Sequence, residues 1–131
     1  MANASNYLRG EIGSGFLNIG AVTLPTVLYV GLFTSALSAD GTGSEVVGNG
    51  YARKQILATS FDDNGTGGFT LNAALEFAQA TGSWGTITDM GIYDASTLGN
   101  LIVFDNLAAS KVIGSGDAFR FNSGSITVDI S

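Results

Sequence analysis

Glycine clusters divide this chain into short apolar runs, and their spacing constrains the fold more than any other feature. Glycine accounts for 19 of the 131 residues, whereas proline occurs once. Short apolar runs bounded by glycine turns at regular intervals are typical of an all-β sandwich or barrel. About eight strands are enough for two packed antiparallel sheets, so we expect a jelly-roll-like antiparallel β-sandwich. The predicted strands are 26–35, 51–60, 69–80, 87–94, 101–107, 111–114, 118–124 and 125–131.

The first residues depart from this strand pattern. Ser5 can cap a short helix, because its side chain can accept a backbone N–H of the first turn. Apolar residues then recur at roughly helical spacing. Three glycines in the segment each weaken a helix by about 1 kcal/mol, so we expect it to form only when packed on the sheet or on a neighbouring subunit. The chain is therefore divided into an N-terminal helix or arm at 1–19 and a β-sandwich domain at 20–131.

The segment 36–50 is a long glycine-rich loop whose only charges are Asp40 and Glu45. Loops longer than about 12–15 residues are usually functional or mobile. An exposed Val46–Val47 pair in such a loop favours contact with a partner surface. The candidate inter-subunit contacts are therefore Leu8, Ile12 and Phe16 in the N-terminal segment and Val46 and Val47 in this loop.

Two strands carry clear predictions of burial. The strand 69–79 has the cleanest alternation of apolar and polar residues, which indicates one buried face. The strand 26–35 is apolar on both faces, which indicates local burial on both sides. Its residues Leu28, Val30 and Leu32, with Ala74 and Ala78, are nevertheless also candidates for apolar surface that another subunit covers. In the strand 69–79, the residues expected to face the core are Phe69, Leu71, Leu75 and Phe77.

Composition excludes several classes of function. The chain has no Cys and no His, which removes disulfides, Cys-based metal sites and the Ser-His-Asp and Cys-His nucleophile systems. The formal charge is −6, which disfavours nucleic acid as a partner. No apolar run reaches the roughly 20 residues of a membrane span. The N-terminal sequence lacks the basic start and apolar run of a signal peptide, so we expect synthesis in the host cytoplasm.

The low charge content favours an assembly. Only 12% of the residues are charged and the mean hydropathy is +0.31, whereas an ordinary globular domain carries about 25% charge. This suggests that another chain covers much of the surface. The alternative is a soluble monomer whose surface consists of Ser, Thr, Asn and Gly.

The carboxylates do not form a recognisable active site in the sequence. Glycoside hydrolysis needs two carboxyls that face one cleft. Asp89 and Asp94 are five residues apart, so on an unbroken strand they point to opposite faces. Asp94 begins a turn, where Asp commonly bonds its own backbone. The turn 62–68 lacks the ligand spacing of a calcium loop, and no glycine cluster continues as a nucleotide-binding motif. We therefore predict no catalytic, cofactor-binding or metal-binding residues.

Trp84 lies between two glycines, just before a predicted strand. An aromatic residue in this place more often closes the end of a sandwich core than binds a ligand. Gly91, in the middle of that strand, allows a neighbouring side chain to lie over the backbone. A carbohydrate-binding module remains an alternative, in which Trp84, Tyr51 and Tyr93 would act as stacking platforms.

Four stretches together resemble a family of small virion proteins of tailed bacteriophages. Members are often described as phage tail-fibre proteins, and head-decoration, or cement, proteins are similar in kind. The resemblance implies a structural role in the virion without catalysis or cofactors, and it transfers no site residues. The stretches are NYLRGEI at 6–12, LYVGLFTSALSADGTGSEVVGNGYARK at 28–54, ATGSWGTITDMGIYDASTLGNLIVF at 80–104 and KVIGSGDAFRFNSGSITVDI at 111–130.

The two virion roles make different demands on the chain. A fibre shaft draws its length from repeats, a coiled coil or a β-helix, and this sequence contains none of these. A compact domain suits a capsomer surface better. The sequence therefore favours a head-decoration protein on the outer shell that binds the major capsid protein and copies of itself as a trimer. A tail-fibre or tail-tip accessory protein is the alternative.

Overall fold

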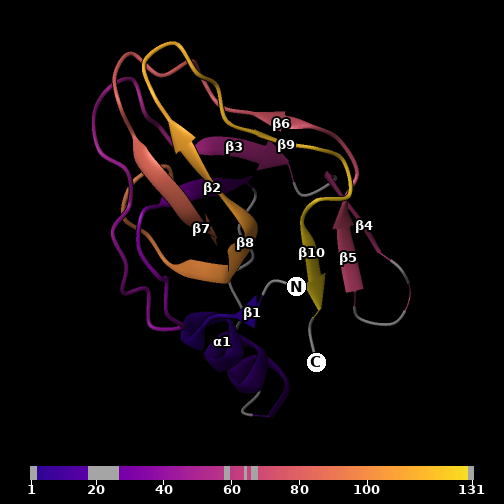
Figure 1. Cartoon of the computed structure of the whole chain (residues 1–131). Helices are drawn as coiled ribbons and strands as arrows, with labels where there is room; N and C mark the ends of the chain where they lie inside the picture. The colour runs from indigo at the N-terminus through magenta and orange to yellow at the C-terminus, as the bar shows by residue number, and fades with distance from the viewer. Residues whose placement is uncertain (1–2, 18–26, 58–59, 64, 66–67, 130–131) are drawn as a thin grey trace.

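The computed structural model describes the chain at residues 3–17, 27–57, 60–63, 65 and 68–129. Antiparallel strands dominate it, and a single helix, α1, lies at one end of the molecule (Figure 1). The strands form three sheets, and one core contains side chains from each of them. The predicted all-β antiparallel sandwich is therefore confirmed.

The largest sheet has five strands in the order β1-β8-β7-β2-β3. Each neighbouring pair in it is antiparallel. Its strands, in chain order, are β1 at Asn3–Ala4, β2 at Val27–Phe33, β3 at Lys54–Leu57, β7 at Gly85–Tyr93 and β8 at Leu101–Ile113.

Two smaller sheets complete the fold. One has three strands in the order β10-β5-β4, and the other pairs β6 with β9. In Figure 1 the three-stranded sheet stands beside β8, across from the bulk of the five-stranded sheet. Their bounds are β4 at Phe61–Asp63, β5 at Gly68–Leu71, β6 at Leu75–Glu76, β9 at Arg120–Phe121 and β10 at Thr127–Asp129.

Strand β2 is buried on both faces, as its sequence predicts. Val30 and Leu32 are fully buried in the main core, between the sheets. Phe33 points to the opposite face and belongs to a second, smaller core with Leu37, Tyr93 and Leu101. We call the face of the five-stranded sheet that carries this second core its outer face. The burial of Val30 and Leu32 also shows that the expectation of outward apolar surface at these two positions was wrong.

Gly91 allows the second core to form. A Cβ atom at this position would lie 2.8 Å from Leu37 Cδ2 and 2.9 Å from Leu101 Cδ1. Both distances are shorter than real Cβ atoms show, so only glycine lets these leucines pack directly on the backbone of β7. The predicted close approach at Gly91 is confirmed.

The single strand predicted at 69–80 is wrong, although its burial is largely right. Leu71, Leu75 and Phe77 are buried, and Phe69 is half-buried. The chain breaks after Leu71, and β5 and β6 belong to different sheets. The bond from the Asn72 N–H to Ser60 O, at 2.8 Å, continues the β4–β5 pairing by one residue, and β6 then pairs with β9 instead.

Several other boundaries differ from the prediction. The runs 101–107 and 111–114 form one continuous strand, β8. Opposite it, Ile87 pairs with Lys111 and Asp89 with Asn106, so 107–110 bulge against a single residue of β7. The strand predicted at 118–124 contracts to β9, and the described residues of the one predicted at 51–60 form a strand over β3.

The helix α1, Asn6–Leu17, is ordered against the sheet of its own chain. Ser5 Oγ accepts the N–H of Leu8 at 3.1 Å and donates to Leu101 O, while Ser5 N donates to Ile102 O at 2.8 Å. Ser5 is therefore the predicted cap, and it also fastens the helix to β8. The sequence analysis expected this segment to pack on the sheet or on a neighbouring subunit, and the structure shows packing on the sheet. The expected domain boundary at 19/20 lies outside the described residues.

Within the described part of the chain, no helix has the length and apolar character that crossing a bilayer requires.

Candidate functional site

A polar cluster on the outer face is organised around Arg53. The guanidinium binds the Glu45 carboxylate through two parallel bonds, Nε to Oε2 and Nη2 to Oε1, each of 2.8 Å. The Arg53 side chain is only 7% exposed. Its guanidinium carbon lies 3.8 Å from the centre of the Tyr93 ring, in a cation–π arrangement. Arg53 thus joins the loop 36–50, the start of β3 and the end of β7.

Tyr51 connects this cluster to the main core. Its hydroxyl donates to Glu45 Oε2 at 2.7 Å and accepts the N–H of Leu32 at 2.9 Å. Burial, followed by the hydrogen bond to Glu45, raises the pKa of Tyr51 well above its usual value, so the phenol stays neutral. Burial alone would lower the pKa of Arg53, but the contacts with Glu45 outweigh it and the pKa is raised. The cluster therefore combines one positive and one negative charge.

The opposite side of the guanidinium holds the loop that joins β7 to β8. Arg53 Nη1 donates to Ala95 O at 2.9 Å and to Leu98 O at 2.7 Å. Asp94 closes the same loop by accepting the backbone N–H of Asn100 at 2.7 Å. This arrangement keeps Leu98 at a φ of 55°, a left-handed conformation that is uncommon for residues other than glycine. Strain of this kind persists only where the surroundings enforce it.

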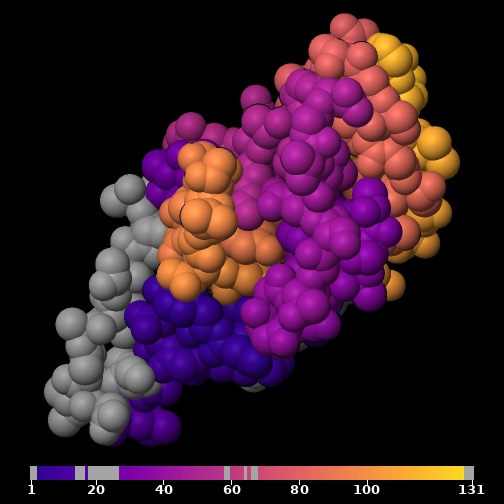
Figure 2. Space-filling model, turned by 90° about the vertical axis from the view of Figure 1, so that its left-hand side faces the viewer, coloured from indigo at the N-terminus to yellow at the C-terminus, as the bar shows by residue number. Residues whose placement is uncertain are grey.

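Two exposed apolar side chains stand beside this cluster. Leu98 is 85% exposed and Val47 is 86% exposed. Both line a hollow of about 260 Å³ whose other walls include Glu45, Tyr51 and Arg53. Figure 2 shows the loop 94–100, in orange, beside the segment 36–50, in magenta. We call the side chains of Val47 and Leu98 the apolar knob. The bond from Arg53 to Leu98 O fixes the backbone that carries one of these two exposed side chains.

Gly31 lies beneath the cluster. A Cβ atom at Gly31 would lie 2.7 Å from Glu45 Oε2 and 3.3 Å from the Tyr51 hydroxyl. It pairs across the sheet with Gly91, so two positions without side chains are adjacent on the outer face. The lack of side chains at these two positions leaves the space in which the cluster packs.

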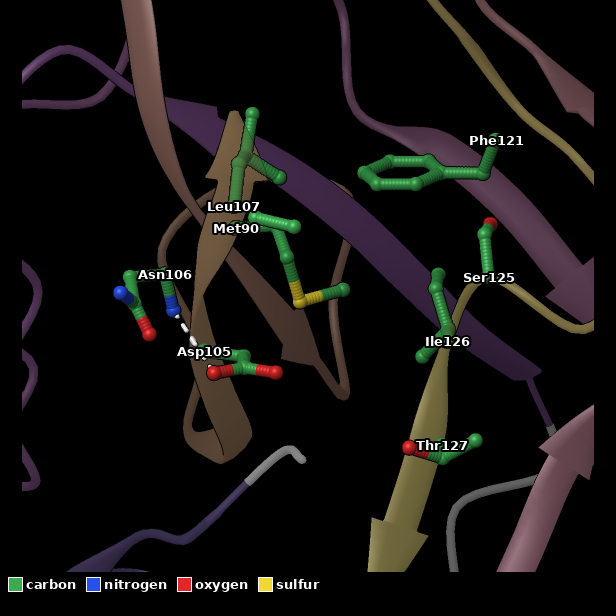
Figure 3. Close-up of a pocket in the computed structure, with 9 residues that line it drawn as sticks. Met90, Asp105, Asn106, Leu107, Phe121, Ser125, Ile126 and Thr127 are labelled. Atoms are coloured by element: carbon green, nitrogen blue, oxygen red, sulfur yellow. Dashed lines mark hydrogen bonds between the residues drawn. The ribbon is translucent and has the colours of Figure 1, made fainter. Parts of the chain in front are cut away.

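A second hollow, of about 290 Å³, lies between β8 and β10 (Figure 3). Met90, Phe121 and Ile126 contribute apolar walls, whereas the Asn106 side chain points away from them. Asp105 is the one carboxylate among the described lining residues, and its Oδ1 accepts the N–H of Asn106 at 2.9 Å. Hydrolysis by a carboxylate pair needs a second carboxyl that faces the same space. The hollow therefore does not present that chemistry.

The other carboxylates bond the fold itself. Asp89 is 7% exposed and accepts the N–H of Leu37 at 3.2 Å, which ties the loop 36–50 to β7. Asp62 accepts the Asn72 amide at 3.0 Å. The turn role predicted for Asp94 is confirmed by its two bonds to Asn100. Among the described residues, side chains able to hold a metal ion do not gather in groups of three or more.

Two of the three aromatic residues considered as sugar platforms, Trp84 and Tyr93, are buried, and Tyr51 is half-buried. Trp84 is 4% exposed, packs edge-on against Tyr51 and donates Nε1–H to Asn49 O at 2.9 Å. Tyr93 is 7% exposed and is covered by Arg53. Stacking of a sugar needs a free ring face, so the platform hypothesis is wrong for Trp84 and Tyr93. The predicted role of Trp84 in closing the core is confirmed.

The structure separates the candidate inter-subunit contacts. Val46 is 6% exposed, so the expected exposed pair is wrong: its N–H donates to Leu32 O at 3.0 Å, which turns the side chain into the main core. Leu8 and Ile12 are half-buried. The side chain of Phe16 lies outside the described residues. Contact of any of them with another subunit stays a prediction.

Sequence reasoning missed the two residues that organise the outer face, Arg53 and Leu98. Arg53 and Glu45 are eight residues apart across a glycine-rich loop, so no helix or strand periodicity brings them together. A signal was nevertheless present, because Arg53 ends the stretch GNGYAR at 48–53. Leu98 gave no signal beyond being an apolar residue in a turn.

Comparison with known protein families gives one clear match. The model of a family described as "Podophage GP4 fiber I protein gp80" matches residues 3–129, which is nearly the whole chain. No curated protein matches the chain.

Proposed function

This chain belongs to the podophage fiber I protein family, and we propose on that premise that it is a non-enzymatic fibre subunit of the virion. The observation that carries the proposal is the match over residues 3–129, since it covers both cores and the Arg53 cluster. The family's description favours the tail-fibre alternative over the head-decoration role that the sequence analysis preferred.

The shape of the described chain narrows the part that it plays in a fibre. A shaft is built from stacked repeats or long coiled helices. The described residues form a sandwich with a single short helix. We therefore assign the chain to a globular part of a fibre, such as its tip or its attachment to the tail.

The outer face supports such a role. The carboxylates described above bond loops and strands, whereas the two side chains of the apolar knob are exposed. Its proposed partners are other fibre or tail proteins and copies of the same chain. Trimeric assembly on the particle surface remains a prediction.

Cryo-electron microscopy of particles with and without the chain tests the proposal. Difference density is expected in a fibre or where a fibre joins the tail, and particles without the chain should adsorb poorly to host cells. Supplying the wild-type chain in trans should restore both. Difference density over the head shell, with loss of head stability and normal adsorption, would instead support the decoration role.

A further inference from the structure

The loop that joins β7 to β8 stands between two hollows of the molecule. On one side it lines the hollow of the apolar knob, through Ser96, Thr97 and Leu98. On the other side it lines a separate hollow, also of about 260 Å³, through Gly99 and Asn100. The loop is therefore a wall that the two hollows share.

The ends of this loop are fixed, whereas its tip is not buried. Tyr93 and Leu101, which flank the loop, are 7% and 5% exposed and belong to the second core. Asp94 and Asn100 close the base of the loop through bonds of 2.7 to 3.2 Å. The residues between them, 95–99, are half-buried or exposed. A segment with so little buried apolar surface opens at a lower free energy than the core around it.

Arg53 supplies the bonds that hold this tip against the cluster. Its Nη1 donates to Ala95 O at 2.9 Å and to Leu98 O at 2.7 Å. The guanidinium has other supports, because Glu45 binds its Nε and Nη2 and the Tyr93 ring lies against it. Release of the tip therefore breaks the bonds to Nη1 and leaves the rest of the cluster in place.

Leu98 acts on the tip in the opposite direction. Its φ of 55° is a left-handed conformation that is unfavourable for leucine, so the held tip carries strain that a released tip loses. Its side chain is 85% exposed, so little burial opposes the release. The bonds from Arg53 favour the held tip and the strain at Leu98 favours a released one.

We propose that residues 95–99 form a strap with two positions. In the closed form, which the structure describes, Arg53 holds the strap and the two hollows are separate. In the open form Leu98 leaves its left-handed conformation, the strap moves away from Arg53, and the two hollows join. The strap carries Leu98, so the two forms also present the apolar knob differently. This behaviour belongs to the isolated chain and does not depend on the proposed role in the virion.

Nuclear magnetic resonance of the purified chain tests the proposal. Relaxation dispersion of the backbone nitrogens measures the population of a minor form that exchanges in microseconds to milliseconds, the range in which loops open. In the wild-type chain the expected exchange is confined to 95–99 and fits one common rate. The open form is expected at about 0.1–10% of the molecules.

The variant Arg53→Lys tests the bonds that close the strap. It keeps a positive charge beside Glu45 but removes the forked guanidinium that reaches both carbonyls. The ratio of open to closed form should rise by about 10- to 100-fold, as expected for the loss of a charged hydrogen bond. Near-ultraviolet circular dichroism reports whether the variant folds. Arg120→Lys is the matched control, since Arg120 pairs with Glu76 on exposed strands, and it should leave the ratio unchanged.

The variant Leu98→Gly tests the strain independently of Arg53. Glycine adopts a positive φ without a steric penalty, so the closed form gains and the ratio of open to closed form should fall. A loop that is merely flexible would respond in the opposite way, because glycine increases the freedom of an unrestrained segment. The variant is made in the wild type and in Arg53→Lys, where the larger open population makes a fall easy to measure.

Three results would overturn the proposal. One is the absence of exchange at 95–99 in both the wild type and Arg53→Lys. Another is exchange that extends equally to Ile92 and Val103, which would indicate fraying of β7 and β8 instead of a strap. The third is a rise in the open population in Leu98→Gly, which would show that the strain at Leu98 does not favour opening.

Discussion

The aromatic end of the main core and the Arg53 cluster place apolar side chains in opposite environments. At the aromatic end, Phe77, Phe119 and Phe121 pack with ring centres 4.9 to 6.4 Å apart, and all three are buried. At the Arg53 cluster, a hydrogen bond from Arg53 holds the backbone of Leu98, and the side chains of Leu98 and Val47 are exposed. The first region stabilises the fold by burial, whereas the second uses polar bonds to present an apolar surface. A region of the second kind is more readily explained by contact with a partner than by stability.

This comparison predicts the largest loss of stability in the aromatic cluster. Phe77→Ala should reduce the free energy of unfolding by about 3–5 kcal/mol, because the cavity would be surrounded by rings that cannot fully close it. Chemical denaturation followed by Trp84 fluorescence measures it, and Phe77→Leu is the control, with a smaller loss. A loss below about 1 kcal/mol for Phe77→Ala would mean that the cluster is not a main source of stability.

A smaller loss is expected when the Arg53 cluster is broken. Arg53→Met should cost about 2–3 kcal/mol, because Glu45 loses its partner and the carbonyls of Ala95 and Leu98 lose their donor. The double variant Arg53→Met with Glu45→Gln should recover part of this loss. Limited proteolysis should cut the loop 94–100 faster in the single variant than in the wild type. Unchanged cleavage would show that Arg53 does not hold the loop.

The smallest effect should have the opposite sign. Leu98→Gly relieves the left-handed backbone strain, so the free energy of unfolding should rise slightly, by about 0.5–1 kcal/mol at most. Leu57→Gly, at an exposed strand position, is the contrasting control and should destabilise the chain. If Leu98→Gly destabilises the chain instead, Leu98 contributes to the fold and the contrast between the two regions is weaker than stated.

Local patterns in the sequence predicted burial better than connectivity. The alternation around Leu71 and Leu75 correctly marked these residues as buried, because burial of alternate residues is a local property of a strand. The break between them depends on the partners of each part, because β5 pairs with β4 and β10 whereas β6 pairs with β9. No local pattern contains such partners, so the sequence indicated one strand where the structure has two.

The neighbours Val46 and Val47 show the same limit at the candidate site. They are identical residues in one loop, so composition and hydropathy cannot distinguish them. The backbone bond from Val46 to Leu32 decides which side chain enters the core and which becomes part of the knob. Asp94 was easier to predict, because its partner Asn100 lies in the same turn.

The missing side chain at Gly31 has a consequence for how the apolar knob can be studied by mutation. A methyl group there would collide with Glu45 Oε2, so Gly31→Ala should displace the carboxylate, the guanidinium and then the loop that carries Leu98. No exposed atom of the knob would have been replaced, yet its position would change. A mutational scan confined to exposed residues would therefore overlook a position that controls this exposed apolar surface from the floor of the sheet.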